Sequence, residues 1–219
     1  RYGRRDNAFK ARIKILVKAL GAEEFARQVE EEWAHLKDGP ATLTQAEVDR
    51  VACHFTTPPY ETLVDDDLDF TNHLQQEKAF ARWVGRNVHG HKVPGYAAVT
   101  VSLKAYDHAT GNVTAEQMEL VADLADRYCF GEARVSHEQN LILADVPKRA
   151  LHALWQELRT HGLATPTVGL LTDIICCPGG DLCALANAKS TPIAMAVQER
   201  LGDLDYLHDI GELELNISG

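Results

Sequence analysis

The sequence has no long hydrophobic run and comparatively few positive charges. No stretch approaches the roughly 20 consecutive apolar residues that a membrane-spanning helix requires, and the first residues do not have the pattern of a secretory signal peptide. The 22 lysines and arginines are outnumbered by 32 aspartates and glutamates, which gives a net charge of −10. Because nucleic-acid phosphates need a basic protein face, we expect a protein with neither a nucleic-acid partner nor a membrane.

Cysteine is scarce as well, with five residues in a chain of 219. A sparse, odd-numbered set does not provide the disulfide framework of a small secreted protein. The thiols are therefore expected to serve packing or metal binding in a reducing compartment, and we predict a cytoplasmic location. The apolar content of 45% and the charged content of 25% are ordinary for a globular protein, and the length is sufficient for one or two domains.

The segment between Thr172 and Ser190 contains three of the five cysteines. Cys177 and Cys183 are joined by the string Pro-Gly-Gly-Asp-Leu, in which the proline and the two glycines favour a tight turn with exposed backbone N–H groups. Such a turn can bring two thiolates to one face and direct N–H donors at them, as an iron–sulfur cluster requires. Two alternatives remain open: small buried cysteines at a strand–helix junction and, less favoured by the spacing, a zinc site.

Apolar periodicity predicts a chain that contains both helices and strands. The predicted helices cover residues 7–20, a second segment that ends at Gly39, and residues 44–55, 80–84, 114–128, 147–162, 181–188 and 192–201. The predicted strands cover residues 96–104, 133–135, 140–146, 169–175 and 213–217. A capping-box pattern, Thr114 with Gln117, begins one of the helices. From residue 96 to 162 the order strand–helix–strand–strand–helix is half of a split β-α-β arrangement with helices on one sheet face.

Several strings in the chain resemble sirohaem-dependent sulfite and nitrite reductases. The most specific is Thr-Asp-Ile-Ile-Cys-Cys-Pro-Gly at 172–179, followed by Cys183 and Ala-Asn at 186–187. It resembles the first half of the cluster motif of that family, in which a second cysteine pair follows about forty residues later. Here the string Asn-Ile-Ser-Gly at 216–219 resembles the one that precedes this second pair. The resemblance implies that Cys177 and Cys183 are ligands of a 4Fe–4S cluster.

The same resemblance predicts cofactor-binding residues in the middle of the chain. The segments from Trp83 to Lys104 and from Arg134 to Asn140 resemble the second ferredoxin-like half domain of the family, whose hairpin faces the sirohaem. Arg134, Gln139 and Asn140 match its arginine and its Gln-Asn pair, and a guanidinium binds a carboxylate with two parallel hydrogen bonds. Without the resemblance, a cross-strand surface charge would explain Arg134 and a hairpin turn would explain Gln139 and Asn140.

Basic residues near the start of the chain provide a second group of candidates. Arg12 and Lys14, together with Arg4 and Arg5, match basic residues that lie close to the sirohaem carboxylates in the family. The resemblance therefore implies that Arg12 and Lys14 bind this cofactor. A solvated helix face is the alternative explanation of this positive cluster.

The resemblance implies an α+β fold class with a ferredoxin-like half domain flanked by parts of two nitrite/sulfite reductase 4Fe–4S-type α/β domains. Residues 1–39 are expected to hold the last helices of the first such domain, and residues 40–78 a linker or insertion. Residues 79–163 are expected to form the half domain, and residues 164–219 the truncated start of the second domain.

The implied parent enzyme reduces sulfite to sulfide, or nitrite to ammonia, in a six-electron step that uses sirohaem and a 4Fe–4S cluster. A flavoprotein or a ferredoxin is the implied electron donor, and no catalytic residue is assigned. Because two thiolates do not complete a four-cysteine cluster, we predict that the 219 residues alone are inactive and hold neither cofactor. The alternative is a non-catalytic binding or assembly module with structural cysteines, and a gene without a cysteine codon directly after Gly219 would favour it.

Overall fold

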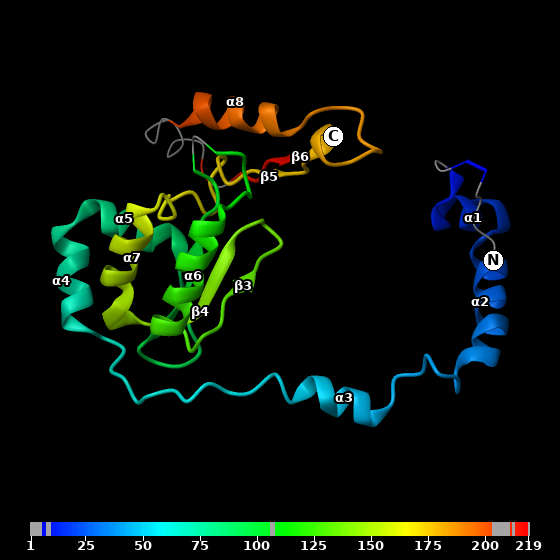
Figure 1. Cartoon of the computed structure of the whole chain (residues 1–219), viewed down its shortest axis with the longest axis horizontal. Helices are drawn as coiled ribbons and strands as arrows, with labels where there is room; N and C mark the ends of the chain where they lie inside the picture. The colour runs from blue at the N-terminus through cyan, green and yellow to red at the C-terminus, as the bar shows by residue number, and fades with distance from the viewer. Residues whose placement is uncertain (1–5, 8–9, 106–107, 203–210, 212, 219) are drawn as a thin grey trace. The chain divides into compact units, whose positions relative to one another are not determined.

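The structure, a computed structural model, describes all residues except 1–5, 8–9, 106–107, 203–210, 212 and 219. The chain divides into two compact units, Arg1–Pro58 and Pro59–Gly219. The division lies inside the segment 40–78 that was expected to be a linker or insertion. Figure 1 labels helices α1 to α8 and strands β3 to β6.

In its described residues the first unit contains three α-helices, α1 (Ile13–Leu20), α2 (Ala22–Leu36) and α3 (Gln45–Ala52). Gly21 separates α1 from α2 with a φ of 84°, a conformation that favours glycine. The first helix begins at Ile13 and not at residue 7 as predicted. The reason is a local turn in which the Lys10 N–H donates to the backbone carbonyl and the side-chain oxygen of Asn7, at 3.0 and 3.2 Å, so that Asn7 competes with the helix for this donor.

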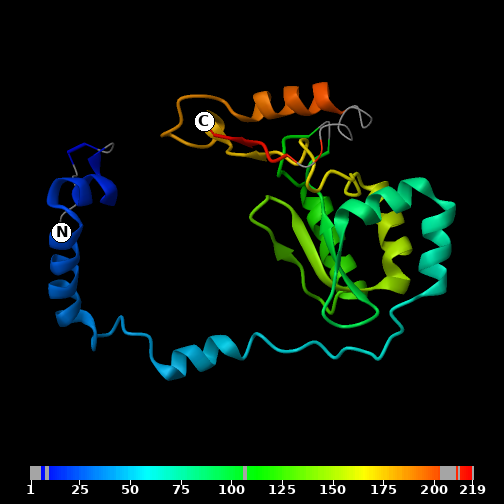
Figure 2. The same cartoon turned by 180° about the vertical axis from the view of Figure 1, so that it is seen from behind.

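The second unit is built on a four-stranded antiparallel sheet in the order β1-β2-β4-β3. The strands are β1 (Val88–Gly90), β2 (Tyr96–Val101), β3 (Arg134–Val135) and β4 (Leu141–Pro147). The central pair aligns Val101 with Leu141 and Val99 with Leu143, and an irregularity lies between Ala97 and Val99. The view from behind in Figure 2 shows the hairpin that joins β3 to β4.

Helices α5 (Lys78–Asn87), α6 (Ala115–Tyr128) and α7 (Leu151–Thr160) bury their apolar faces against this sheet. The core combines residues of these helices with residues of β2 and β4, among them Trp83, Val99, Leu124, Leu143 and Leu154. Burying a large apolar side chain contributes about 1.5–3 kcal/mol, so this set dominates the stability of the unit. The predicted α+β class with a ferredoxin-like half domain is confirmed.

The start of α6 agrees with the local sequence pattern. The predicted capping box is present, because the Gln117 N–H donates to the Thr114 hydroxyl and the Thr114 N–H donates to the Gln117 side chain.

Helix α4 (Leu68–Gln76) was not predicted, since it lies in the segment that was expected to be a linker. Its apolar residues Phe70 and Leu74 pack against the core, which explains why a weakly patterned segment is helical.

The cysteine-containing segment is less regular than predicted. Its strand β5 (Ile175–Cys176) pairs in parallel with β6 (Asn216–Ile217), and helix α8 (Thr191–Leu201) follows the cysteine loop. Both strands are shorter than the sequence pattern indicated. The predicted helix at 181–188 is wrong: only a short 3₁₀ turn, η3 (Gly179–Asp181), is present. The side chains of Leu182 and Leu185 are exposed, so this segment has no apolar contact to stabilise a helix.

None of the helices in the described part of the chain is long and apolar enough to cross a membrane.

Candidate functional site

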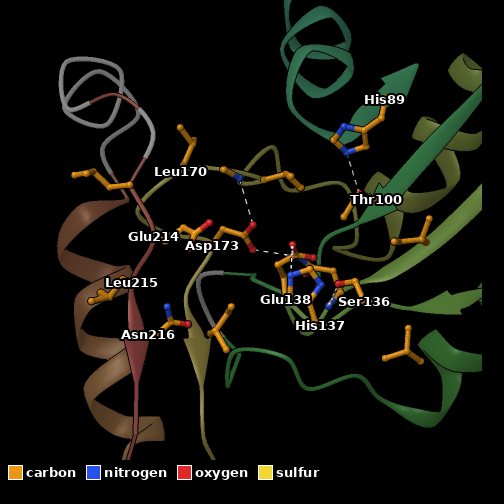
Figure 3. A pocket seen from close by; sticks show the side chains of 17 residues that line it. His89, Thr100, Ser136, His137, Glu138, Leu170, Asp173, Glu214, Leu215 and Asn216 are labelled. Carbon is orange, nitrogen blue, oxygen red and sulfur yellow. Dashed lines mark hydrogen bonds and ion pairs between the residues drawn. The ribbon is translucent and has the colours of Figure 1, made fainter. Parts of the chain in front are cut away.

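A cavity of about 810 Å³ is lined by residues of the β3–β4 hairpin and of the segments that carry β5 and β6. Figure 3 shows its lining, which includes His89 and Thr100 from the sheet, Glu138 from the hairpin turn and Asp173 from the segment before β5. The His89 imidazole lies 3.1 Å from the Thr100 hydroxyl. The cavity therefore adjoins the segment that leads to Cys177.

Gln139 joins the hairpin to the cysteine-containing segment. Its side-chain nitrogen donates to the Cys176 carbonyl at 2.9 Å, and its side-chain oxygen accepts from the Cys176 N–H at 2.9 Å. The residue has a φ of 59°, which is uncommon for a residue other than glycine. The amide thus gives β5 the backbone partners that a neighbouring strand would supply, directly before Cys177.

Asn140 makes a second connection between the same elements. The residue is buried, its side-chain oxygen accepts from the Leu103 N–H at 3.0 Å, and its side-chain nitrogen donates to an Asp173 carboxylate oxygen at 3.2 Å. Gln139 and Asn140, both predicted to bind cofactor, are therefore brought together with the cysteine segment. In this structure their side chains hold its backbone and Asp173.

Lys104 is fully buried under the same segment, and its role was not predicted. Its ammonium donates to the Ile174 carbonyl at 2.5 Å, and the Thr110 hydroxyl donates to the same oxygen at 2.8 Å. Burial lowers the pKa of Lys104, and the nearby charge of Asp173 opposes that effect. Nothing in the local pattern distinguishes this lysine from an exposed one, because its contacts lie about seventy residues away in sequence.

Asp173 carries the opposite charge beside Lys104. Burial raises the pKa of its carboxyl group, while hydrogen bonds from Asn140 and the Gly169 N–H, and the charge of Lys104, act in the opposite direction. The half-buried Asp173 carboxyl group and the buried Lys104 ammonium therefore influence each other electrostatically, just before Cys176 and Cys177 in the sequence. Such a pair fixes geometry more than it adds stability, because the desolvation of both charges offsets their attraction.

The cysteine loop directs a backbone donor at sulfur, as the sequence suggested. The Gly179 N–H donates to the Cys177 sulfur at 3.3 Å, and the Cys183 N–H donates to the Gly179 carbonyl at 2.9 Å. Gly179 has a φ of 61°, and a Cβ at this position would lie 2.6 Å from the Ala188 carbonyl oxygen. Only glycine fits this turn, which connects the two candidate ligands.

The three cysteines of the segment have different surroundings. Cys176 is buried, burial raises the pKa of its thiol, and its sulfur donates to the Cys177 carbonyl. Cys177 is half-buried and Cys183 is exposed. Cys177 and Cys183 are thus more accessible than Cys176, which packs beside Ile174.

A 4Fe–4S cluster needs four thiolates, and the loop offers two of them with an N–H donor to one. In the described part of the chain, no third histidine, cysteine or carboxylate atom lies within common reach of this pair. The loop therefore fits one half of the ligand set that such a cluster requires.

Arg134 lies on the edge strand β3 and is not among the residues that line the cavity. Its side chain is 56% exposed, its Nε lies 2.5 Å from a Glu132 carboxylate oxygen and its Nη2 lies 3.9 Å from Asp145. The adjacent Val135 does line the cavity. The guanidinium is therefore accessible and paired with carboxylates, which is the type of group that it would bind in a carboxylated cofactor.

The remaining candidates belong to the first unit. Arg12 precedes α1 and Lys14 lies within it, and both are exposed. Arg4 and Arg5 lie outside the described residues. Arg12 and Lys14 thus belong to the first compact unit, and the cysteine loop belongs to the second.

Comparisons with known proteins agree with this architecture. Residues 89–161 match the family model of the nitrite/sulfite reductase ferredoxin-like half domain. A chloroplastic ferredoxin–nitrite reductase of Zea mays is 28% identical over 208 residues, which are 91% of this chain and 30% of that protein. Sulfite reductase [ferredoxin] 1 of Mycolicibacterium paratuberculosis is 27% identical over 210 residues, which are 93% of this chain and 31% of that protein.

A solved structure shows the same fold. The NirA protein of Mycobacterium tuberculosis matches with a TM-score of 0.56 and 24% identity, over 98% of this chain and 33% of that chain.

Residues 89–161 thus form a ferredoxin-like half domain of the nitrite/sulfite reductase type. Over more than nine tenths of its length the chain is similar to nitrite and sulfite reductases, and the resemblance noted from the sequence is confirmed. The chain spans about 30% of the length of the relatives named above.

Proposed function

We propose that this chain is part of a reductase that converts nitrite to ammonia or sulfite to sulfide with sirohaem and a 4Fe–4S cluster. The observation that carries this proposal is the loop from Cys177 to Cys183, where the Gly179 N–H donates to a sulfur. The resemblance of the surrounding string to the family motif supports the same assignment. When bound, the two cofactors would transfer electrons from an external donor to the anion, which takes up six in the complete reduction.

Cys177 and Cys183 would provide two of the four thiolates of the cluster. Gln139 and Asn140 would contribute to the cofactor site through the backbone, because they fix the segment that ends at Cys177. The backbone before Cys177 is held by Gln139 on one side and by strand β6 on the other, which would keep the Cys177 thiolate in place. This arrangement is the reason to assign these two residues a positioning role.

The sirohaem carboxylates would be bound by Arg134 and, from the first unit, by Arg12 and Lys14. An arginine is suited to this task because its planar guanidinium forms two parallel hydrogen bonds to a carboxylate. Glu132, the present partner of Arg134, is itself exposed, so exchanging it for a cofactor carboxylate costs little desolvation.

We further propose a ferredoxin as the electron donor, since the relatives are named as ferredoxin-dependent enzymes; a flavoprotein is the alternative donor. The names of the relatives include both nitrite and sulfite reductases, so the proposed substrate is either anion. The 219 residues alone are proposed to be inactive, because Cys177 and Cys183 form only half of a ligand set.

The test uses the complete gene product that contains this chain. Iron, acid-labile sulfide and the visible spectrum are measured for the unchanged protein and for Cys177→Ser, Cys183→Ser and Cys53→Ser. The first two substitutions should abolish the cluster absorbance and the reduction of nitrite or sulfite. Cys53→Ser should retain both, since Cys53 is an exposed thiol of the first unit.

Full iron content in Cys177→Ser or Cys183→Ser would overturn the cluster assignment. It would favour the other function class, a binding or assembly module in which the cysteines are structural. Comparing the rates with nitrite and with sulfite, using a chemically reduced dye as the donor, identifies the substrate.

A further inference from the structure

Three potential metal ligands meet on the second unit, away from the cysteines. His73 lies in α4, Glu77 follows this helix directly, and His152 lies in the first turn of α7. One ligand atom from each residue lies within 4.8 Å of the others. Among the residues that the structure describes, they form the only group of three histidines, cysteines or carboxylates with this property.

The geometry points to a binding site for a divalent transition-metal ion, with Zn²⁺ as the representative ion. Two imidazoles and one carboxylate are a common zinc donor set, usually completed by a water molecule. The His152 Nε2 lies 2.7 Å from a Glu77 carboxylate oxygen, and the His73 Nδ1 lies 3.8 Å from the same oxygen. The same carboxylate oxygen thus lies near a nitrogen of each imidazole.

The surroundings favour a defined site over a chance surface cluster. Phe80 is fully buried and its ring is nearly perpendicular to both imidazoles, with ring centroids 6.4 Å from His73 and 5.1 Å from His152. The three ligand side chains are 38%, 39% and 15% exposed for His73, Glu77 and His152. The site therefore has a packed apolar floor and a side open to solvent, where an ion and its water ligand have room.

The present arrangement of the His73 and His152 imidazoles shows that one of them must move before a metal ion binds. The imidazoles of His73 and His152 are stacked, with centroids 3.6 Å apart and an angle of 8° between their planes. A bound zinc ion lies in the plane of each imidazole, about 2.0 Å from its nitrogen. Two parallel rings separated in this way do not share one ion, so binding must tilt one of them. His73 is the more exposed ring and is expected to tilt.

The experiment measures Zn²⁺ binding to the full chain by isothermal titration calorimetry. Cys53, Cys177 and Cys183 are replaced by serine throughout, since exposed or half-buried thiols also bind zinc. We expect one Zn²⁺ per chain. His73→Ala, His152→Ala and Glu77→Gln should each weaken the zinc affinity at least roughly tenfold. Replacing a residue that only supports a metal ligand commonly lowers metal affinity by this factor, and a ligand itself should matter at least as much.

The matched control is His137→Ala. His137 lies 3.1 Å from Glu138 and is exposed, so it offers a histidine–carboxylate pair without a second imidazole, and its loss should leave the affinity unchanged. A second measurement follows the imidazole proton signals of His73 and His152 by NMR, which should lose the mutual ring-current shift when Zn²⁺ is added.

Unchanged zinc affinity in Glu77→Gln or His73→Ala, or an intact ring stack in the presence of Zn²⁺, would overturn the proposal. Glu77→Gln nearly conserves shape and therefore decides the question if a histidine variant fails to fold. Because the site is separate from the cysteine loop, its outcome is independent of the proposed reductase function.

Discussion

The side-chain amide of Gln139 forms two hydrogen bonds with the backbone of Cys176, one through each of its polar atoms. This pairing joins the hairpin of the half domain to the strand that precedes Cys177. Three predictions concern this junction and the loop that follows it.

Gln139→Ala should lower the free energy of unfolding by about 1–3 kcal/mol, because it leaves two buried backbone groups of Cys176 without partners. Alanine is as strained as glutamine at a φ of 59°, so the effect reports the lost hydrogen bonds. Chemical denaturation measures the change, and hydrogen exchange of the Cys176 amide locates it. The control Gln156→Ala alters an exposed residue of α7. Equal stability and equal amide protection in both variants would contradict the prediction.

Gly179→Ala should destabilise the cysteine loop by about 1–3 kcal/mol, because the residue has a positive φ and the new Cβ would lie 2.6 Å from the Ala188 carbonyl. Gly180→Ala is a matched control, since its Cβ would meet the same carbonyl at an ordinary 3.5 Å. Thermal unfolding compares the two variants. The rate at which Cys177 reacts with a thiol reagent should rise in Gly179→Ala alone; similar rates in both variants would be evidence against the special role of Gly179.

Lys104→Met should raise the pKa of Asp173 further, because the ammonium now opposes the effect of burial on this carboxyl group. A raised pKa in the folded state means that the stability contributed by Asp173 is complete below the ordinary value of 3.8 and is lost as the pH rises through the raised value. In Lys104→Met this loss should occur at a higher pH. NMR titration of the Asp173 carboxyl carbon measures the shift.

Thr110→Val is the control for the lysine variant. It removes the other donor to the Ile174 carbonyl without changing a charge, so the pKa of Asp173 should move little. If both variants shift this pKa equally, the charge of Lys104 is not the cause.

The half domain was largely predictable from the sequence because its signals are local. The capping box at Thr114 and the apolar pattern of β2 each involve residues that are only a few positions apart in the sequence. The cysteine loop was recognised for the same reason, since Pro178 and Gly179 lie beside Cys177. Such patterns determine a turn or a strand wherever the rest of the chain lies.

The contacts that hold the site were not predictable in this way. Lys104 reaches Ile174, and Gln139 reaches Cys176, across 70 and 37 positions respectively. Only the packing of the hairpin against the later segment creates these bonds. The mistaken helix at 181–188 has the same origin, since its periodic alanines and leucines found no surface on which to pack.

The parallel pairing of β5 with β6 has a consequence for biosynthesis. The N–H groups of Ile175 and Cys177 donate to the carbonyls of Leu215 and Ile217, residues that the ribosome releases about forty positions later. The half domain, whose strands and helices precede residue 163, emerges first and is able to fold as a unit. The thiols of the loop therefore reach their final arrangement only after Leu215 and Ile217 have been synthesised, on a half domain that is already complete.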